Sequence, residues 1–289
     1  MTSSIPRTVL VTGSSTGIGR ACVLHLASRA WTVFAGVRRP SDAESLSAEL
    51  SSSSLHPILL DITDAASIST AVSQIEKMTG AAGLNALVNN AGISINGPVE
   101  MLTIDDWRKQ FEVNLFGQIA MTRATLPLLR AAATPAATSR IVMMSSIAGR
   151  VGQPIIGPYC ASKFALEAVS DALRLELKSQ HIEVSLVEPG AIKSEIWKKA
   201  QDSALAIDRN HPAAERYAKT IDAVVAMAGQ AEKQAIPASR VAAVVEHCLT
   251  SNRPPIRRLV GRDAKLAAFA KAILPDRIFD AALSRAFKL

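Results

Sequence analysis

The sequence predicts an α/β fold in which a doubly wound, parallel, seven-stranded sheet lies between two helical layers, a three-layer αβα arrangement with a C-terminal helical tail. Strand-like and helix-like segments alternate along the 289 residues, as they do where right-handed crossovers join parallel strands. The strand-like segments are mostly continuously apolar, which is typical of strands covered on both faces. The first of them ends in a glycine-rich loop. A single domain over residues 1–289 accommodates this pattern.

The expected strands lie at residues 7–12, 31–37, 56–62, 85–91, 139–146, 182–189 and 256–261. Between them, segments such as 64–78 and 163–178 have the composition of helices. Residues 191–237 lack a strand pattern, so we expect an insertion before the last strand that serves as a substrate loop. Residues 263–289 form the expected helical extension.

Composition argues against several classes of protein. The net charge of +7 is concentrated after Arg253, where nine basic residues face three acidic ones, and aromatic residues make up only 4%, so we expect no nucleic-acid partner. No apolar run is long enough to cross a bilayer, and the first residues do not resemble a signal peptide. Three widely spaced cysteines and five histidines show no metal-binding spacing, so we expect no metal and a cytoplasmic location.

A glycine pattern follows the first strand. Gly13, Gly17 and Gly19 are spaced G-x-x-x-G-x-G and open a helix. Glycines at such a turn let a phosphate approach the main-chain N–H groups of the helix N-terminus, and the hydroxyls of Ser15 and Thr16 add donors. Because the loop closes the first strand of a βαβ unit, the pattern predicts a Rossmann-type dinucleotide site.

The end of the second strand indicates which dinucleotide binds. Folds of this kind place an acidic residue there for the ribose hydroxyl of NAD(H), or an arginine for the 2′-phosphate of NADP(H). Here Arg38 and Arg39 occupy the position, and no acidic residue occurs before Asp42. The sequence therefore predicts NADP(H), with NAD(H) as the alternative.

A tyrosine and a lysine lie one helical turn apart, at Tyr159 and Lys163. Interconversion of an alcohol and a carbonyl by hydride transfer needs a group that accepts or donates the hydroxyl proton. A free tyrosine has a pKa near 10, and a neighbouring ammonium group favours the phenolate. We therefore expect Lys163 to lower the pKa of Tyr159, while a serine hydroxyl holds the substrate oxygen.

Five motifs occur in order: TGSSTGIG (12–19), NNAG (89–92), the serine pair of VMMSSIAG (142–149), YCASK (159–163) and EPG (188–190). Together they resemble the single-domain branch of the short-chain dehydrogenases/reductases over roughly residues 5–262. The resemblance implies that Asn114, Ser146, Tyr159 and Lys163 are catalytic, with Asn114 holding a water of a proton relay. It also implies cofactor contacts from Gly13, Ser15, Thr16, Gly17, Ile18, Gly19, Arg38, Asp61, Ile62, Asn90, Ala91, Gly92, Tyr159, Lys163, Pro189, Gly190, Ile192 and Ser194.

The tail resembles that of members acting on steroids, retinoids and other hydrophobic alcohols, which implies a hydrophobic alcohol or ketone as substrate. Segments 147–156 and 191–235, including Trp197, are expected to form the pocket wall. Leu266, Phe269 and Ile273 share one face of a basic helix. We expect the tail to fold over the domain, close the cleft or pack on a second subunit; peripheral membrane contact through 263–289 is the less favoured alternative.

Three further alternatives concern assembly and activity. The resemblance implies a homodimer or homotetramer through the long helices after Ile104 and Tyr159. A 3-oxoacyl reductase acting on a carrier-bound thioester is a second enzymatic interpretation. A catalytically silent NADP(H)-binding regulator is the third, although such a regulator would not need Ser146, Tyr159, Lys163 and Asn114 together.

Overall fold

The computed structural model describes residues 7–50, 53–193, 207 and 211–287. Its centre is a sheet of seven parallel strands in the order β3-β2-β1-β4-β5-β6-β9, which confirms the predicted doubly wound sheet. The strands are β1 (Thr8–Val11), β2 (Thr32–Val37), β3 (Leu55–Leu59), β4 (Ala86–Asn89), β5 (Ser139–Met144), β6 (Ile182–Pro189) and β9 (Arg257–Val260).

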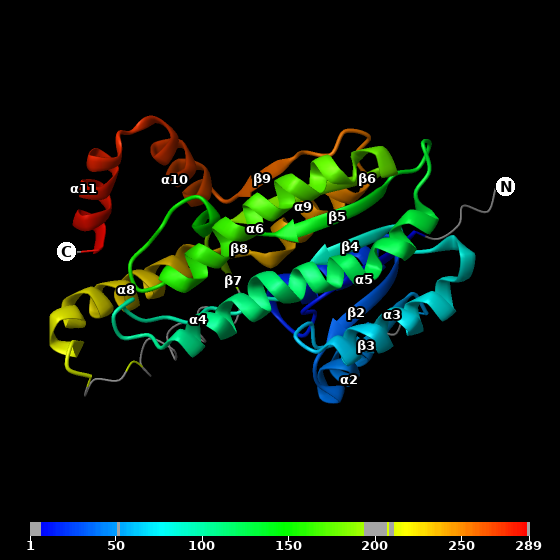
Figure 1. Ribbon diagram of the computed structural model, residues 1–289, viewed down its shortest axis with the longest axis horizontal. Helices are drawn as coiled ribbons and strands as arrows, with labels where there is room; N and C mark the ends of the chain where they lie inside the picture. Colours follow the sequence, from blue (N-terminus) through cyan, green and yellow to red (C-terminus); the bar gives the residue numbers. More distant parts are fainter. Residues whose placement is uncertain (1–6, 51–52, 194–206, 208–210, 288–289) are drawn as a thin grey trace.

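Helices cover both faces of the sheet, because successive strand residues point to opposite sides. Val9 and Val11 of β1 pack in one apolar core with helices α1 (Gly17–Ala27), α2 (Pro40–Glu49) and α9 (Ala238–Thr250). Leu10 packs in a second core with α3 (Ala65–Thr79), α5 (Gly117–Ala132) and α6 (Gly157–Glu176). Figure 1 shows α5 and α6 as long helices crossing the sheet.

Shorter elements complete the two layers. Helix α4 (Ile104–Phe111) begins at a capping box formed by Thr103 and Asp106 and continues through a π turn (Glu112–Phe116) into α5. Three 3₁₀ turns lie at η1 (Gly80–Ala82), η3 (Ile147–Gly149) and η4 (Lys178–Gln180).

Strand β3 ends three residues earlier than the sequence pattern suggests. The N–H of Asp61 donates to the Ser67 hydroxyl at 2.9 Å, and its carboxylate accepts from the Thr63 N–H at 2.9 Å. These local bonds replace the sheet ladder, so Asp61 and Ile62 lie in the loop after the strand.

The segment between β6 and β9 carries structure that its sequence did not indicate. Two-residue strands β7 (Ile192–Lys193) and β8 (Ile236–Pro237) pair in parallel and bracket helix α8 (Ala214–Gln234). Ile155, Ile207 and Ile221 form a small third apolar cluster between this segment and the loop after β5. Ser194 and Trp197, which the sequence placed in this segment, lie outside the described residues.

The tail forms α10 (Arg262–Ile273) and α11 (Asp276–Phe287). Helix α10 packs against β9 and η3, and α11 packs against α8, at one end of the molecule in Figure 1. On α10 Ala264 is buried, whereas Leu266, Phe269 and Ile273 are 69%, 61% and 58% exposed in the single chain. None of the helices described reaches the length and apolarity needed to cross a membrane.

Candidate active site

The loop after β1 forms a cradle at the carboxyl edge of the sheet. Gly13 and Gly17 have positive φ angles of 67° and 58°, a region that favours glycine. A Cβ atom on Gly19 would lie 2.2 Å from the Gly13 carbonyl oxygen, so the loop closes directly on the first turn of α1. Thr16 precedes α1 without forming a side-chain cap. The first-turn N–H groups thus fit an anionic phosphate, as expected for a bound dinucleotide.

The loop after β4 is bound to this cradle. The Thr12 hydroxyl accepts from the main-chain N–H groups of Asn90 and Ala91, both at 3.0 Å. In return, the Asn90 amide donates to the carbonyl oxygens of Thr12 and Gly13 at 2.9 and 3.0 Å. The Asn90 side chain therefore shapes the cradle. Sequence reasoning missed Thr12, although it is the first residue of the TGSSTGIG motif.

Asn114 lies in the π turn and is fully buried. Its side-chain oxygen accepts from the Ile93 N–H at 2.8 Å, and its amide nitrogen donates to the Ile93 carbonyl at 3.0 Å and to the Ser162 hydroxyl at 3.2 Å. The Ser162 hydroxyl donates in turn to the Tyr159 carbonyl at 2.7 Å. Asn114 thus connects the segment after Gly92 to the helix that carries Tyr159, and its side-chain amide is already bonded to protein groups.

Ser146, Tyr159 and Lys163 are brought together where β5 ends and α6 begins. The Ser146 hydroxyl lies 3.4 Å from the Pro189 carbonyl, to which it donates, and accepts from the Ala148 N–H at 3.2 Å. The Ser146 side chain lies near enough to the Tyr159 phenol to lower its pKa. The Lys163 ammonium group lies 5.8 Å from the centre of the Tyr159 ring and donates to the Met144 carbonyl at 2.7 Å.

The pKa values of Tyr159 and Lys163 differ from those that the sequence suggested. Burial of the phenol raises the pKa of Tyr159 to about 12, and the neighbouring Ser146 hydroxyl only partly opposes this effect. Burial also lowers the pKa of Lys163 to about 8, against the charge of Glu167. The expectation that Lys163 lowers the phenol's pKa is therefore wrong for the chain by itself. At neutral pH the folded chain holds a neutral phenol.

The far end of the cradle carries the residues expected around the adenosine. Arg39 forms two hydrogen bonds to Asp42 at 2.8 and 2.9 Å. Among the described residues Arg38 forms no such ion pair, and its positive charge acts on Asp61. Burial raises the pKa of Asp61, but bonds from Thr63 and the charge of Arg38 outweigh this and leave it below its ordinary value. Ile62 is buried beside Gly117.

Below the site lies a group of ion pairs that the sequence reasoning did not identify. Glu188, fully buried at the end of β6, binds Arg150 through two bonds of 2.6 and 3.0 Å. Burial raises the pKa of Glu188 to about 7 in spite of Arg150. Arg257 of β9 bonds Glu167 of α6 at 3.0 Å. The first pair joins the strand before Pro189 to the loop after Ser146, and the second joins β9 to α6. The only sequence signal was Glu188 in the EPG motif.

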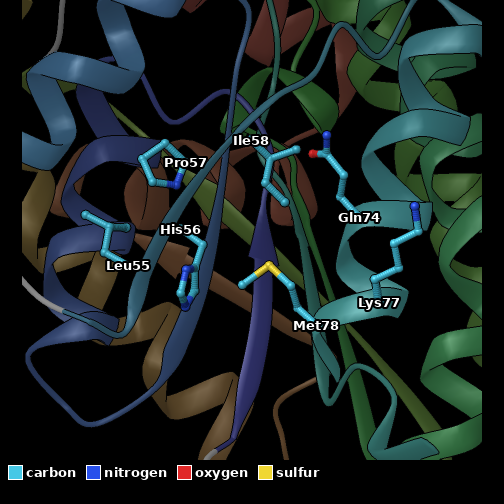
Figure 2. Close-up of a pocket in the computed structure, with 7 residues that line it drawn as sticks. All are labelled: Leu55, His56, Pro57, Ile58, Gln74, Lys77 and Met78. Atoms are coloured by element: carbon cyan, nitrogen blue, oxygen red, sulfur yellow. The ribbon is translucent and has the colours of Figure 1, made fainter. Parts of the chain in front are cut away.

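A surface cavity of about 430 Å³ lies elsewhere, along edge strand β3 and helix α3 (Figure 2). Its lining includes His56, Pro57 and Met78, and none of the residues expected in the site. The candidate active site is therefore defined by the carboxyl ends of β1, β4, β5 and β6. A dinucleotide cradle, a neutral phenol and a buried amine at this edge define the class: an oxidoreductase with a doubly wound fold.

Comparison with known proteins identifies the family. The model of the short chain dehydrogenase family matches residues 7–205. The chain is 35% identical over 274 residues to the NADPH-dependent 3-dehydrocapnine reductase of Ornithobacterium rhinotracheale, covering 95% of each chain. It is 35% identical over 289 residues to mouse retinol dehydrogenase 5, covering 96% of this chain and 87% of that one.

A solved short-chain dehydrogenase from Streptomyces avermitilis superposes with a TM-score of 0.78 at 27% identity, over 99% of this chain and 97% of that one. The chain belongs to the short-chain dehydrogenase family, whose members are oxidoreductases acting on CH–OH groups.

Proposed function

We propose that this protein is an NADP(H)-dependent oxidoreductase that interconverts a hydrophobic alcohol and its ketone or aldehyde by hydride transfer. The observation that carries the proposal is the neutral, half-buried phenol of Tyr159 beside the Ser146 hydroxyl. A phenol with a pKa of about 12 stays protonated at neutral pH and can donate to a carbonyl oxygen as charge develops there. In the reverse reaction the same oxygen would accept the proton of the alcohol.

The chain's own residues have distinct roles in this proposal. Ser146 holds the substrate oxygen, and Tyr159 supplies the proton. Lys163, fixed by the Met144 carbonyl, places its amine one turn below the phenol. Asn114 holds the start of α6 against the segment after β4. The bound cofactor supplies the hydride to the carbonyl carbon.

Two observations support NADP(H) as the cofactor. The guanidinium of Arg38 makes no ion pair within the described chain, and arginine suits a 2′-phosphate. The reductase relative from O. rhinotracheale is described as NADPH-dependent. The glycine loop, Asn90 to Gly92, Asp61 and Ile62 would hold the rest of the dinucleotide, and the turn from Pro189 to Ile192 would flank the nicotinamide.

A hydrophobic substrate is supported by the third apolar cluster. Ile155, Ile207 and Ile221 gather where the loop after β5 meets the segment 191–237, with Met101 and Tyr217 packed beside them. A relative described as a retinol dehydrogenase agrees with an apolar alcohol or its carbonyl partner.

Assembly and location are further parts of the proposal. Phe116 and Phe164 are 53% and 45% exposed, on the π turn and on α6. Apolar surface on these helices supports a homodimer or homotetramer formed through them. Sedimentation of the wild type and of Phe164→Glu tests this, since a monomeric wild type contradicts it. A cytoplasmic location stays a prediction.

The first experiment measures oxidation of NADPH and NADH, separately, by the wild type on a panel of hydrophobic ketones and aldehydes. We expect turnover with NADPH, and a fall of about 10²- to 10⁴-fold in Tyr159→Phe, because the proton donor is lost. NADPH binding without turnover on any carbonyl would indicate the silent regulator. Turnover only on a carrier-bound thioester would indicate the 3-oxoacyl reductase.

A matched pair of variants tests the cofactor preference. Arg38→Ala is expected to weaken NADPH binding about tenfold and to leave NADH binding unchanged, because only NADPH carries the 2′-phosphate. Arg39→Ala is the control, since Arg39 already pairs with Asp42. Equal losses for both cofactors in Arg38→Ala would refute the assignment.

A further inference from the structure

The tail reaches back into the turn that follows β6. Asp263, in the first turn of α10, accepts a hydrogen bond from the main-chain N–H of Ala191 at 2.6 Å. The adjacent N–H, that of Gly190, donates to the Val260 carbonyl at 2.9 Å. Two acceptors at the junction of β9 and α10, the Val260 carbonyl and the Asp263 carboxylate, therefore bind two successive N–H groups of the turn from Pro189 to Ala191.

Two glycines make room for this carboxylate. A Cβ atom on Gly190 would lie 2.1 Å from one oxygen of Asp263, and a Cβ atom on Gly261 would lie 2.3 Å from the other. Gly261 also has a φ of 113°, which other residues rarely adopt. The Asp263 carboxylate can therefore occupy this place only because residues 190 and 261 are glycines. An acidic residue that merely interacted with the dipole of α10 would not need glycines around it.

The same helix touches a second part of the site. Helix α10 packs against η3, the turn that directly follows Ser146, as well as against β9. Ser146 in turn donates to the Pro189 carbonyl at 3.4 Å. The start of α10 therefore borders both the serine loop and the turn that would flank the nicotinamide.

We propose that Asp263 is a positioning residue that fixes the turn from Pro189 to Ala191, so that the C-terminal extension completes the nicotinamide end of the site. The proposal rests on the proposed function for the identity of that end. Asp263 acts through the turn, by holding the Ala191 N–H in place, and does not itself take part in the reaction.

The test compares Asp263→Ala, Asp263→Asn and Asp276→Ala. Asp263→Ala removes the acceptor, whereas Asp263→Asn keeps an oxygen for the Ala191 N–H. Asp276 is the matched control, because it lies in the first turn of α11, is exposed and pairs with Lys271 away from the turn.

The first measurement is amide hydrogen exchange of a peptide covering 187–193 in the protein without cofactor. We expect exchange at Ala191 to quicken about 10- to 100-fold in Asp263→Ala, the range for losing a hydrogen bond to a charged acceptor, and to recover largely in Asp263→Asn. Asp276→Ala should match the wild type. Unchanged exchange in Asp263→Ala would overturn the proposal, whether or not the protein turns over any carbonyl.

The second measurement is the dissociation constant of NADPH, with KM and kcat where turnover is found. Asp263→Ala should raise the constant for NADPH about tenfold, with the KM of the ketone unchanged, and Asp263→Asn should restore it. Asp263→Ala could instead lower the melting temperature by the same amount as Asp276→Ala and leave the dissociation constant of NADPH unchanged. In that case Asp263 has only a structural role, and the proposal fails. If the wild type does not bind NADPH, the proposed function is refuted. The hydrogen-exchange measurement would still show whether Asp263 fixes the turn at Ala191.

Discussion

The loops after β1 and β4 and the segment between β6 and β9 are held in the protein in different ways. The first two loops exchange buried hydrogen bonds through Thr12 and Asn90, and Gly19 closes on Gly13 without room for a methyl group. The described part of the segment carrying α8 is held by a small apolar cluster, by the short β7–β8 pair, by packing of α11 on α8 and by exposed bonds from Tyr217 and Arg216 to Glu100.

This difference shows which side tolerates change. The glycine cradle is specified by contacts with no spare volume, whereas the segment that we propose as the substrate wall is attached with fewer buried polar bonds. We therefore expect substitutions of equal size to have unequal effects on the two sides.

The largest contrast is expected between two buried isoleucines. Ile75→Ala in the second core should lower the free energy of unfolding by about 4 kcal/mol, because it leaves a cavity in a large, closely packed region. Ile221→Ala in the third cluster should cost about 1 kcal/mol, because α8 can open locally. Urea unfolding and proteolysis of α8 measure the two effects. Equal losses would show that α8 belongs to the cooperative core.

Two glycines sharpen the comparison within the cofactor side. Gly19→Ala should cost about 3 kcal/mol and abolish NADPH binding, since its Cβ would overlap the Gly13 carbonyl and the Asn90 amide. Gly152→Ala is the control, because no atom lies within 4 Å of a Cβ atom there, and it should change stability by less than about 0.5 kcal/mol. A stable, NADPH-binding Gly19→Ala protein would contradict the tight cradle.

The buried amine of Lys163 predicts a pH dependence of stability. Its pKa is about 8 when folded and about 10.5 ordinarily, so between these values the unfolded chain binds more protons. The free energy of unfolding should therefore rise with pH from 8 to 10.5, by up to about 3 kcal/mol relative to Lys163→Met. Denaturant titrations of both proteins across this window provide the difference, and a flat difference curve would show that Lys163 is not desolvated.

The smallest contrast is between two hydroxyl groups. Thr12→Val should cost about 1 kcal/mol, because the partly buried N–H groups of Asn90 and Ala91 lose their acceptor. Tyr217→Phe should leave the melting temperature unchanged, since its bond to Glu100 is exposed to solvent. Thermal unfolding decides the matter; a larger loss in Tyr217→Phe would mean that α8 is held more firmly than its contacts indicate.

The sequence predicted the parts of the structure that depend on short stretches of chain. Apolar runs located the seven strands of the main sheet but not β7 and β8, and the spacing from Gly13 to Gly19 located the cradle. The contacts of Thr12, Arg150 and Asp263 were not predictable, because each bonds a residue 38 to 79 positions away. The pKa of Tyr159 depends on burial, which spacing to Lys163 does not reveal. The helical periodicity predicted which residues share the apolar face of α10, but it could not predict whether that face packs on the domain or lies on the surface of the chain.

The carboxylate of Asp263 also sets an order in which substitutions can accumulate. While Asp263 is present, a Cβ atom at position 190 overlaps its carboxylate, so we expect a substitution of Gly190 to destabilise the turn. Once Asp263 is replaced by a smaller residue, position 190 is released and can acquire a Cβ atom. An aspartate at 263 then no longer fits, and simple reversion is blocked. We therefore expect the order of substitutions to matter: Asp263 has to be replaced before Gly190, and Asp263 can be restored only after Gly190 is restored.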